Sequence, residues 1–186
     1  MGLKNIQEEF VKLSLDKDAR EKAFDPSSTI LNDFDHLKLS VKRHAYSLIR
    51  KRLGVVKSIL RNTKAAMGDA FDNEFLKFAA ASEVPSGIDR HRKDSIQFAE
   101  WLIKETQDSK KSKLLKVLLS HELQPVHMWM NKKKLSIQFY SRSPHQIISL
   151  YRDSISSTKA RISPTVVIWW ETNGGQPCYQ WKSYSL

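Results

Sequence analysis

The chain has 186 residues and a formal net charge of +11, with 31 Lys and Arg against 20 Asp and Glu. Its 40% of hydrophobic and 27% of charged residues are ordinary for a folded protein, which excludes a chain that is disordered throughout. The single cysteine, Cys178, excludes an internal disulfide and a multi-cysteine metal cage, and it is typical of a reducing compartment. No apolar run approaches the ~20 residues of a membrane-spanning helix, and residues 1–10 lack the apolar core of a signal peptide. We therefore expect a soluble, cytoplasmic protein of one or two small domains.

The chain begins with short helical segments. Apolar residues spaced three or four apart predict a helix at 6–13. A second short helix is expected at 16–24, and Pro26 opens a turn rich in capping residues. A helical turn at 30–34 then leads into a long helix at 37–64. This helix contains nine Lys or Arg and no acidic residue, so it carries most of the excess positive charge.

The long helix is predicted to have two faces. Apolar side chains at spacings of three and four indicate a stripe that faces the core: Val41, Ala45, Ile49, Leu53, Val56 and Leu60. The same spacing on another side gives what we call the basic stripe: Arg43, Ser47, Arg50, Gly54, Lys57, Arg61 and Lys64. The basic stripe is either a solvated helix face or a docking surface for an anionic or protein partner. A glycine inside a helix costs about 1 kcal/mol relative to alanine, so we expect Gly54 to mark the close approach of another backbone.

Two more helices complete the first part of the chain. Residues 69–81 place Phe71, Phe75 and Phe78 at positions i, i+4 and i+7, which predicts an amphipathic helix with an aromatic face. A loop at 82–87 separates it from a helix at 88–106.

The composition changes after a helix predicted at 114–123. Alternating apolar residues predict strands at 126–130 and 135–140, joined by an Asn-Lys turn. Ser143 and Pro144 form a cap and first-turn pair for a helix that follows them.

The last strands form a hairpin. Residues 165–171 are apolar on both faces, which predicts a central strand that is covered on both sides. Asn173, Gly174 and Gly175 predict a tight turn into a returning strand at 178–184.

We therefore predict an α+β fold. A helical domain at 1–106 is followed by a polar linker at 107–113. A small domain at 114–186 contains a three- or four-stranded antiparallel sheet with one or two helices.

The sequence shows no catalytic constellation. His121 and His127 are six residues apart with Pro125 between them, whereas a zinc-binding helix needs two histidines four residues apart. Cys178 lies within a predicted strand and has no base near it in the sequence. We expect no metal or other cofactor on this chain and no enzymatic activity of the chain alone.

The signals for binding are stronger. The C-terminal hairpin is rich in aromatic side chains: Trp169, Trp170, Tyr179, Trp181 and Tyr184. A sheet this small is fully covered on one face only, so some of these side chains should lie at an interface, where Trp and Tyr are favoured. An exposed edge can accept an extended peptide as an additional strand. Alternatively, Gln180, Lys182 and Ser183 protect that edge against pairing.

The order of these segments resembles the partner proteins of multinuclear non-haem iron oxygenase-type enzymes that modify ribosomally made peptides, and most of all the partner subunits of methanobactin biosynthesis. The resemblance covers nearly the whole chain and is one of pattern and order. It is carried by EEFVKLSLDKDAREKAFDPSSTI, LIRKRLGVVKSILRNTKAAMGDAFDNEFLKFA, DSIQFAEWL and VVIWWETNGGQPCYQW.

This resemblance implies a specific role. Such partners carry no metal, form a heterodimer with the iron enzyme, which holds the iron, and help to present a precursor peptide. In methanobactin biosynthesis the complex uses molecular oxygen to convert precursor cysteines into the oxazolone and thioamide groups of a copper chelator. The leader part of the precursor is expected to bind the partner protein, with strand addition as the natural mode.

Two functions follow as hypotheses. In the first, the chain is a non-catalytic subunit that binds a peptide on its sheet and docks the enzyme through Arg50, Lys57 and Arg61. The predicted peptide-binding residues are Ile137, Phe139, Val167, Trp169, Tyr179, Trp181 and Tyr184. In the alternative, the chain is a nucleic-acid-binding module that uses the basic stripe and the hairpin as a wing, and its binding should weaken steeply with salt. The absence of an apolar span gives no reason to expect a membrane partner.

Overall fold

The fold is known from a computed structural model of the chain. The predicted helical turn at 30–34 and the hairpin turn at 173–175 lie outside the residues that it describes. The described residues are 8, 10–13, 15–23, 35–106, 109–152, 163–172 and 178–185, with side chains not described at 35–38, 109, 152 and 178.

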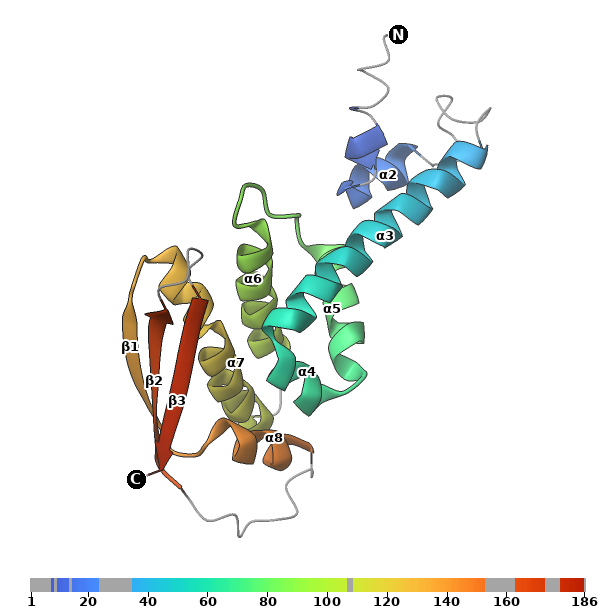
Figure 1. Ribbon diagram of the computed structural model, residues 1–186. Coiled ribbons are helices and arrows are strands. Elements are labelled where there is room, and N and C mark those ends of the chain that lie inside the picture. The colour runs from blue at the N-terminus through green and yellow to red at the C-terminus, as the bar shows by residue number, and fades with distance from the viewer. Residues whose placement is uncertain are drawn as a thin grey trace.

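The helices precede an antiparallel sheet, which confirms the predicted α+β class (Figure 1). The sheet has three strands in the order β1-β2-β3, with a helix between β1 and β2. None of the described helices is long and apolar enough to cross a membrane. The elements are α2 (Lys17–Ala23), α3 (Asp35–Ile59), α4 (Arg61–Met67), α5 (Ala70–Ala81), α6 (Arg90–Glu105), α7 (Ser109–Met130), β1 (Leu135–Tyr140), α8 (Pro144–Arg152), β2 (Thr165–Thr172) and β3 (Cys178–Ser185).

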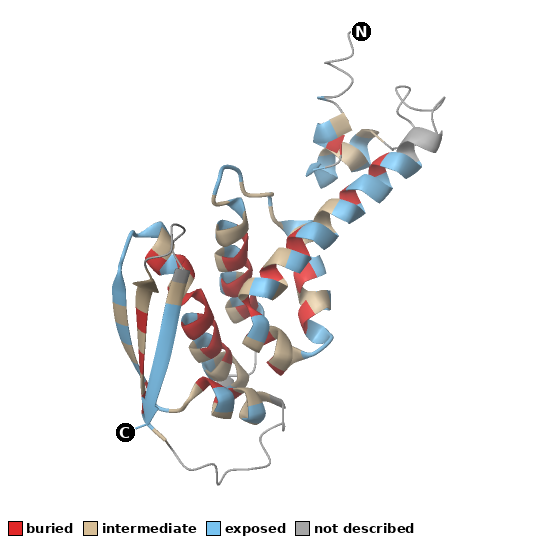
Figure 2. Ribbon diagram, viewed as in Figure 1, coloured by how far each residue is buried: buried red, intermediate tan, exposed pale blue. Residues whose placement is uncertain are grey.

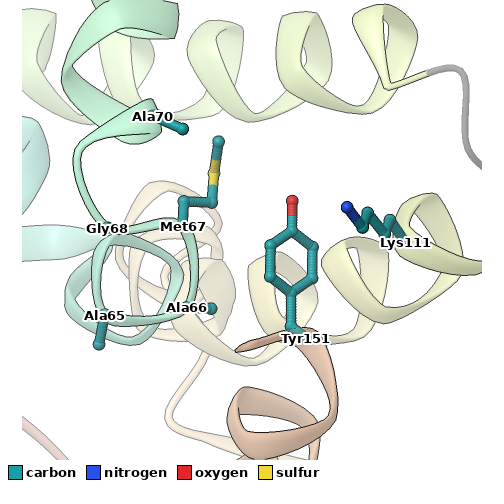
Figure 3. A pocket seen from close by; sticks show the side chains of 7 residues that line it. All are labelled: Ala65, Ala66, Met67, Gly68, Ala70, Lys111 and Tyr151. Atoms are coloured by element: carbon teal, nitrogen blue, oxygen red, sulfur yellow. The ribbon is translucent and has the colours of Figure 1, made fainter. Parts of the chain in front are cut away.

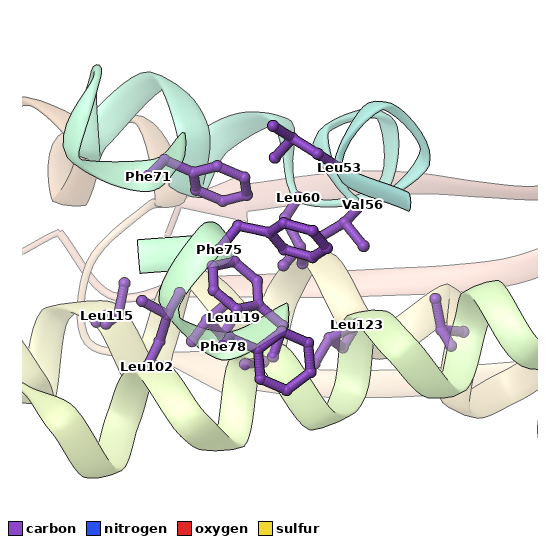
Figure 4. Packing of buried hydrophobic residues seen from close by; sticks show 13 residues of the cluster. Leu53, Val56, Leu60, Phe71, Phe75, Phe78, Leu102, Leu115, Leu119 and Leu123 are labelled. Atoms are coloured by element: carbon purple, nitrogen blue, oxygen red, sulfur yellow. The ribbon is translucent and has the colours of Figure 1, made fainter. Parts of the chain in front are cut away.

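The helical core forms where the apolar stripes of α3, α5, α6 and α7 meet (Figure 4). Phe71, Phe75 and Phe78 of α5 are buried, as their spacing predicts. The ring of Phe98 on α6 packs against Phe71 at 5.2 Å and Phe75 at 5.1 Å between centroids, with near-perpendicular planes. Such edge-to-face pairs add to the stability gained by burying the rings. The predicted apolar stripe of α3 is confirmed, with Val56 fully buried.

The prediction of one continuous helix at 37–64 is wrong at Leu60. Helix α3 ends at Ile59, Leu60 has φ −101° and ψ 51°, and α4 begins at Arg61. The new helix start is held by Glu122 of α7, whose carboxylate accepts hydrogen bonds from the backbone N–H groups of Asn62 and Thr63. Helical periodicity continues through Leu60, so the sequence pattern does not reveal a break that a distant carboxylate stabilises.

The prediction of a strand at 126–130 is also wrong, because these residues form the end of α7. Pro125 lies inside this helix and does not end it, although it cannot donate the usual hydrogen bond to the carbonyl four residues earlier. Val126 packs into the helical core while Met128 packs against the sheet. A helix that is buried on two sides carries apolar residues on both. Some of them then fall two residues apart, as apolar residues do in a strand.

Helix α7 also runs through the predicted linker. Residues 109–113 are helical, while 107 and 108 are not described. Leu115, Leu119 and Leu123 of α7 belong to the helical core, whereas Met128 belongs to the cluster beneath the sheet. The predicted boundary at 107–113 therefore falls at the start of a helix that both parts of the chain share.

The predicted start of α8 is confirmed. Gln146 donates its backbone N–H to the hydroxyl of Ser143, and Ser143 donates its backbone N–H to the amide oxygen of Gln146, both at 3.3 Å. These reciprocal bonds form a capping box, with Pro144 at the first helical position.

Gly54 does not mark a close approach within the described residues. A Cβ atom at this position would meet no atom within 4 Å, and the residue is exposed. Among the described residues, therefore, no backbone approaches Gly54, and the approach of a partner's backbone stays a prediction.

Candidate functional site

Strand β1 presents its apolar side chains to the outside. Leu135, Ile137 and Phe139 are 58%, 51% and 76% exposed, whereas Tyr140 is buried. Because successive side chains of a strand point to opposite faces, Ser136 and Gln138 lie on the side that faces α7. This is the reverse of the usual arrangement, in which the apolar face packs on the core.

A polar network between α7 and β1 holds this orientation. Gln124 of α7 donates its Nε2 to the hydroxyl of Ser136 at 2.7 Å. Gln138 donates its Nε2 to Oε1 of Gln124, and Ser120 donates its hydroxyl to Oε1 of Gln138 at 3.4 Å. The hydroxyl of Tyr140 donates to the same oxygen of Gln138. A strand turned over would leave the buried amide of Gln124 against apolar side chains, which is unfavourable.

The side of the sheet opposite α7, here called the outer face, is covered by none of the described helices (Figures 1 and 2). The pairing register places Ile137 beside Ile168 and Lys182, and Phe139 beside Val166 and Tyr184. Among the side chains described on this face, Lys182 is the only charged one. The outer face comprises Leu135, Ile137, Phe139, Val166, Ile168, Trp170, Gln180, Lys182 and Tyr184.

The same register shows which main-chain groups face the open edges. Glu171 donates its backbone N–H to the carbonyl of Lys134 at 2.9 Å, which marks these two residues as a hydrogen-bonded pair. Hydrogen-bonded pairs alternate along an antiparallel ladder, so residues 136, 138 and 140 bond to β2. Residues 135, 137 and 139 consequently direct their N–H and C=O groups away from the sheet. On β3 the residues that face the edge are 179, 181 and 183.

The face toward α7 carries an aromatic cluster around His121. The imidazole lies 5.2 Å from the Trp169 ring and 4.9 Å from the Trp181 ring, which it meets edge-on. His121 is 5% exposed, and neither ring nitrogen has a hydrogen-bond partner among the described residues. Burial, helped by the nearby positive charge of His145, lowers the pKa of His121 to about 4. His121 is therefore a neutral packing residue at physiological pH.

The predicted peptide-binding residues lie on both faces of the sheet. Ile137, Phe139 and Tyr184 are exposed on the outer face. Val167 and Trp169 belong to the central strand, are fully buried and pack with Met128 of α7.

Tyr179 and Trp181 lie on the face toward α7, at the edge formed by β3. One surface therefore does not contain all seven residues. Leu135, Val166, Ile168 and Trp170 also lie on the outer face but were not predicted. The strand period could have found them, because Leu135 lies two residues from Ile137, and Val166 and Ile168 flank the inward-facing Val167.

The predicted docking residues occupy different environments. Arg50 is exposed, and its guanidinium lies 5.2 Å from the ring centroid of Tyr46. Lys57 forms an ion pair with Asp72 of α5 at 2.6 Å. Arg61 is exposed but lies on α4, beyond the break, and donates its Nε to the carbonyl of Ser58 at 3.0 Å.

A separate pocket of about 430 Å³ opens between α4, α5, α7 and α8 (Figure 3). Met67, Lys111 and Tyr151 contribute the larger side chains, and the remaining lining is alanine and glycine. The lining contains no histidine, carboxylate or cysteine, so these residues offer no metal ligand set. Elsewhere in the described part of the chain, no three His, Cys, Asp or Glu side chains are placed to hold a metal ion.

Comparisons with known proteins match only the helical part. Residues 32–104 are similar to a family described as SCO6045-like, C-terminal domain. The match holds α3, α4, α5 and nearly all of α6, and it stops before α7 and the sheet. The comparison with curated proteins found no match, and the comparison with solved structures found none either.

Proposed function

We propose that this chain is a non-catalytic partner subunit that binds a precursor peptide on its sheet and forms a heterodimer with an iron-dependent oxygenase-type enzyme. In its most specific form, the proposal places the chain in methanobactin biosynthesis, where the iron enzyme converts precursor cysteines to oxazolone and thioamide groups. The iron belongs to the partner enzyme, and the peptide-modifying chemistry is carried out by the complex.

The observation that carries this proposal is the reversed alternation of β1. Exposed apolar side chains at 135, 137 and 139 are unfavourable in water, and a polar network with α7 keeps them there. Contiguous exposed apolar surface marks interaction sites. An open sheet edge next to it is suited to an extended peptide, because added strands combine main-chain hydrogen bonds with alternate side-chain contacts.

The helical part supports the docking role. Arg50 and Arg61 are exposed, and the basic stripe gives α3 a positive surface toward an acidic partner. The matching family is described as a C-terminal domain, which agrees with a helical unit that works beside another domain.

The direct test is co-expression with the iron-enzyme gene next to the gene for this chain. We expect the two proteins to elute as one heterodimer at micromolar concentration, with iron bound in the complex. We expect the chain alone to hold no stoichiometric iron and to modify no peptide. Separate elution of the two proteins would contradict the proposal.

Charge reversal tests the docking surface. Arg50→Glu with Arg61→Glu should weaken the heterodimer about tenfold or more, because reversed charges at an interface repel the partner. Lys77→Glu with Lys93→Glu is a matched control with the same change in net charge at exposed lysines outside the basic stripe. Equal effects of the two pairs would show that only overall charge matters.

The competing proposal is nucleic-acid binding by the basic stripe. Arg43 and Arg50 of the stripe are exposed on α3, and so is the neighbouring Lys51, which is the observation that favours it. Binding through six or more phosphates should weaken by roughly 10³-fold between low and moderate salt. Failure to bind duplex or single-stranded DNA or RNA at low salt would remove this proposal.

A further inference from the structure

We infer that the edge of β1, rather than that of β3, receives the peptide, and that it selects an extended segment with alternating apolar residues and an acidic end. This inference rests on the proposed peptide-binding function of the sheet and specifies its site and its ligand chemistry.

Strand β1 is the unprotected edge of the sheet. Natural sheet edges are protected by charged residues, proline or bulges, because exposed main-chain groups otherwise pair with other chains. Strand β1 contains no charged residue and no proline, and every edge-facing position from 135 to 139 carries an exposed apolar side chain.

The edge of β3 also lacks proline, but it carries a charged residue and no continuous row of apolar side chains. Trp181 is 43% exposed and packs edge-on against His121. The next edge-facing residue is Ser183, and Lys182 lies between them. A peptide added to β3 would therefore gain apolar contact from Tyr179 and Trp181 alone, and both lie on the face toward α7.

Positive charge gathers at the start of β1. Lys132, Lys133 and Lys134 precede β1 and are all exposed, and none of them takes part in an ion pair with a described residue. The outer face adds only Lys182. An acidic group on the ligand would therefore meet uncompensated positive charge at the start of β1.

The same charges disfavour a second copy of this chain. Antiparallel pairing of two β1 edges centred on Ile137 would bring Lys132 of one copy beside Arg142 of the other. Both residues lie just beyond the ends of β1, where like charges brought together repel each other, and each copy has a net charge of +11. The occupant is therefore a different, acidic chain.

Both existing pairings of the sheet are antiparallel, and we take the added strand to continue this pattern. In antiparallel addition, the C-terminal end of the peptide lies beside residues 132–134. Alternate peptide side chains then continue the apolar row of Leu135, Ile137 and Phe139. The expected ligand is thus an extended segment whose acidic residues follow its apolar alternation.

The probe is a fluorescent peptide of alternating Val and Thr that ends in a run of Glu, with a scrambled peptide and one that carries the Glu run at its N-terminal end. Ile137→Pro is the decisive variant, because the N–H of Ile137 faces the edge and its loss breaks no bond to β2. Ser183→Pro is the matched control, since the N–H of Ser183 faces the edge of β3 in the same way. Ile137→Thr keeps the N–H and controls for the lost side chain, and circular dichroism confirms that each variant is folded.

We expect Ile137→Pro to weaken binding of the probe by about tenfold or more, because added strands depend on main-chain bonds. Ser183→Pro should leave it unchanged. Loss of binding with Ser183→Pro but not with Ile137→Pro would assign the peptide to β3 and overturn the inference.

A charge exchange tests the acidic end. Lys133→Glu with Lys134→Glu should weaken binding of the acidic probe and favour a probe that ends in Lys. The exposed pair Lys113→Glu with Lys116→Glu on α7 is the control. Equal weakening by both pairs would overturn the assignment, as would absence of probe binding at millimolar concentration. Neither result bears on heterodimer formation, which tests the proposed function by itself.

Discussion

Glu122 of α7 and Thr63 of α4 form a buried contact between elements that are far apart in the chain. The carboxylate accepts the backbone N–H of Thr63 at 2.9 Å and its hydroxyl at 2.6 Å, and also the backbone N–H of Asn62. The first N–H groups of a helix have no partner within the helix, and a local capping side chain usually accepts them. Leu60 at the cap position has no such group, so Glu122 takes its place.

Removal of this carboxylate should destabilise the fold strongly. Glu122→Ala leaves the buried N–H and hydroxyl of Thr63 without their acceptor, which we expect to cost about 2–4 kcal/mol. Urea unfolding followed by circular dichroism measures this loss. Glu122→Gln keeps one acceptor oxygen and should cost less. A loss below about 1 kcal/mol for Glu122→Ala would mean that α4 does not depend on the cap.

The Glu122→Gln variant also gives a pH signature. Burial raises the pKa of Glu122 above its ordinary value of 4.5, against the opposing effect of its hydrogen bonds. The folded state therefore holds this proton more tightly than the unfolded state does. The stability that Glu122 contributes is complete below pH 4.5 and declines as pH rises through its raised pKa. The difference in unfolding free energy between wild type and Glu122→Gln should accordingly shrink as pH rises.

His121 produces the opposite slope. Its pKa falls from 6.5 to about 4 in the folded protein, so the unfolded state binds the proton more readily. Its contribution is present above pH 6.5 and is lost as pH falls toward 4, by up to about 3 kcal/mol. His121→Phe should not show this loss. The unfolding free energy of the wild type should therefore fall relative to that of the variant as the solution is acidified. A difference that stays constant from pH 7 to pH 4 would contradict the burial of a neutral imidazole.

Titration of Glu122 and titration of His121 change the unfolding free energy in opposite directions as pH falls. The pH dependence of the wild type alone therefore does not separate the two effects. His145→Gln offers a further check, because it removes the positive charge that helps to lower the pKa of His121. This variant should make the acid loss slightly smaller, because the pKa of His121 in the folded protein then lies closer to its unfolded value.

Sequence periodicity predicted the elements that have one buried face. The phenylalanines of α5 and the apolar stripe of α3 each follow a single helical period, and both were correct. Helix α7 was partly misassigned because it lies between two layers, with Val126 in one cluster and Met128 in the other. Its apolar residues therefore follow neither the helical period nor the strand period alone.

The sequence of β1 alone does not determine which of its two faces points toward the core. Alternation at 135–140 predicts a strand equally well with either face toward the core. The choice is made by Ser120 and Gln124, which lie on another element and bond to the polar side of β1. For the same reason the predicted peptide-binding residues mixed the two faces of the sheet.

A buried ion pair joins α3 to α6 within the basic helix. Arg52 donates its Nε and Nη2 to the two carboxylate oxygens of Asp94 at 3.0 and 2.8 Å, with side chains only 9% and 2% exposed. Asp94→Leu should cost about 3–5 kcal/mol, because it leaves the guanidinium buried without a partner. Arg52→Met combined with Asp94→Leu should be closer to wild type than Asp94→Leu alone. Chemical unfolding of the double-mutant cycle measures the coupling, and additive losses would show that the pair acts as two independent residues.

Substitutions at Gly54 test the stability of the chain and its docking to the enzyme separately. An alanine Cβ at this exposed helical position meets nothing within 4 Å, so Gly54→Ala should raise the unfolding free energy by about 0.5–1 kcal/mol. Ser47→Ala, on the same basic stripe, should gain less, since serine is the better helix former of the two original residues. If the basic stripe is the docking surface for the enzyme, Gly54→Trp should leave the isolated chain folded and weaken the heterodimer. An unchanged heterodimer would place the enzyme elsewhere and leave the stripe as a solvated helix face.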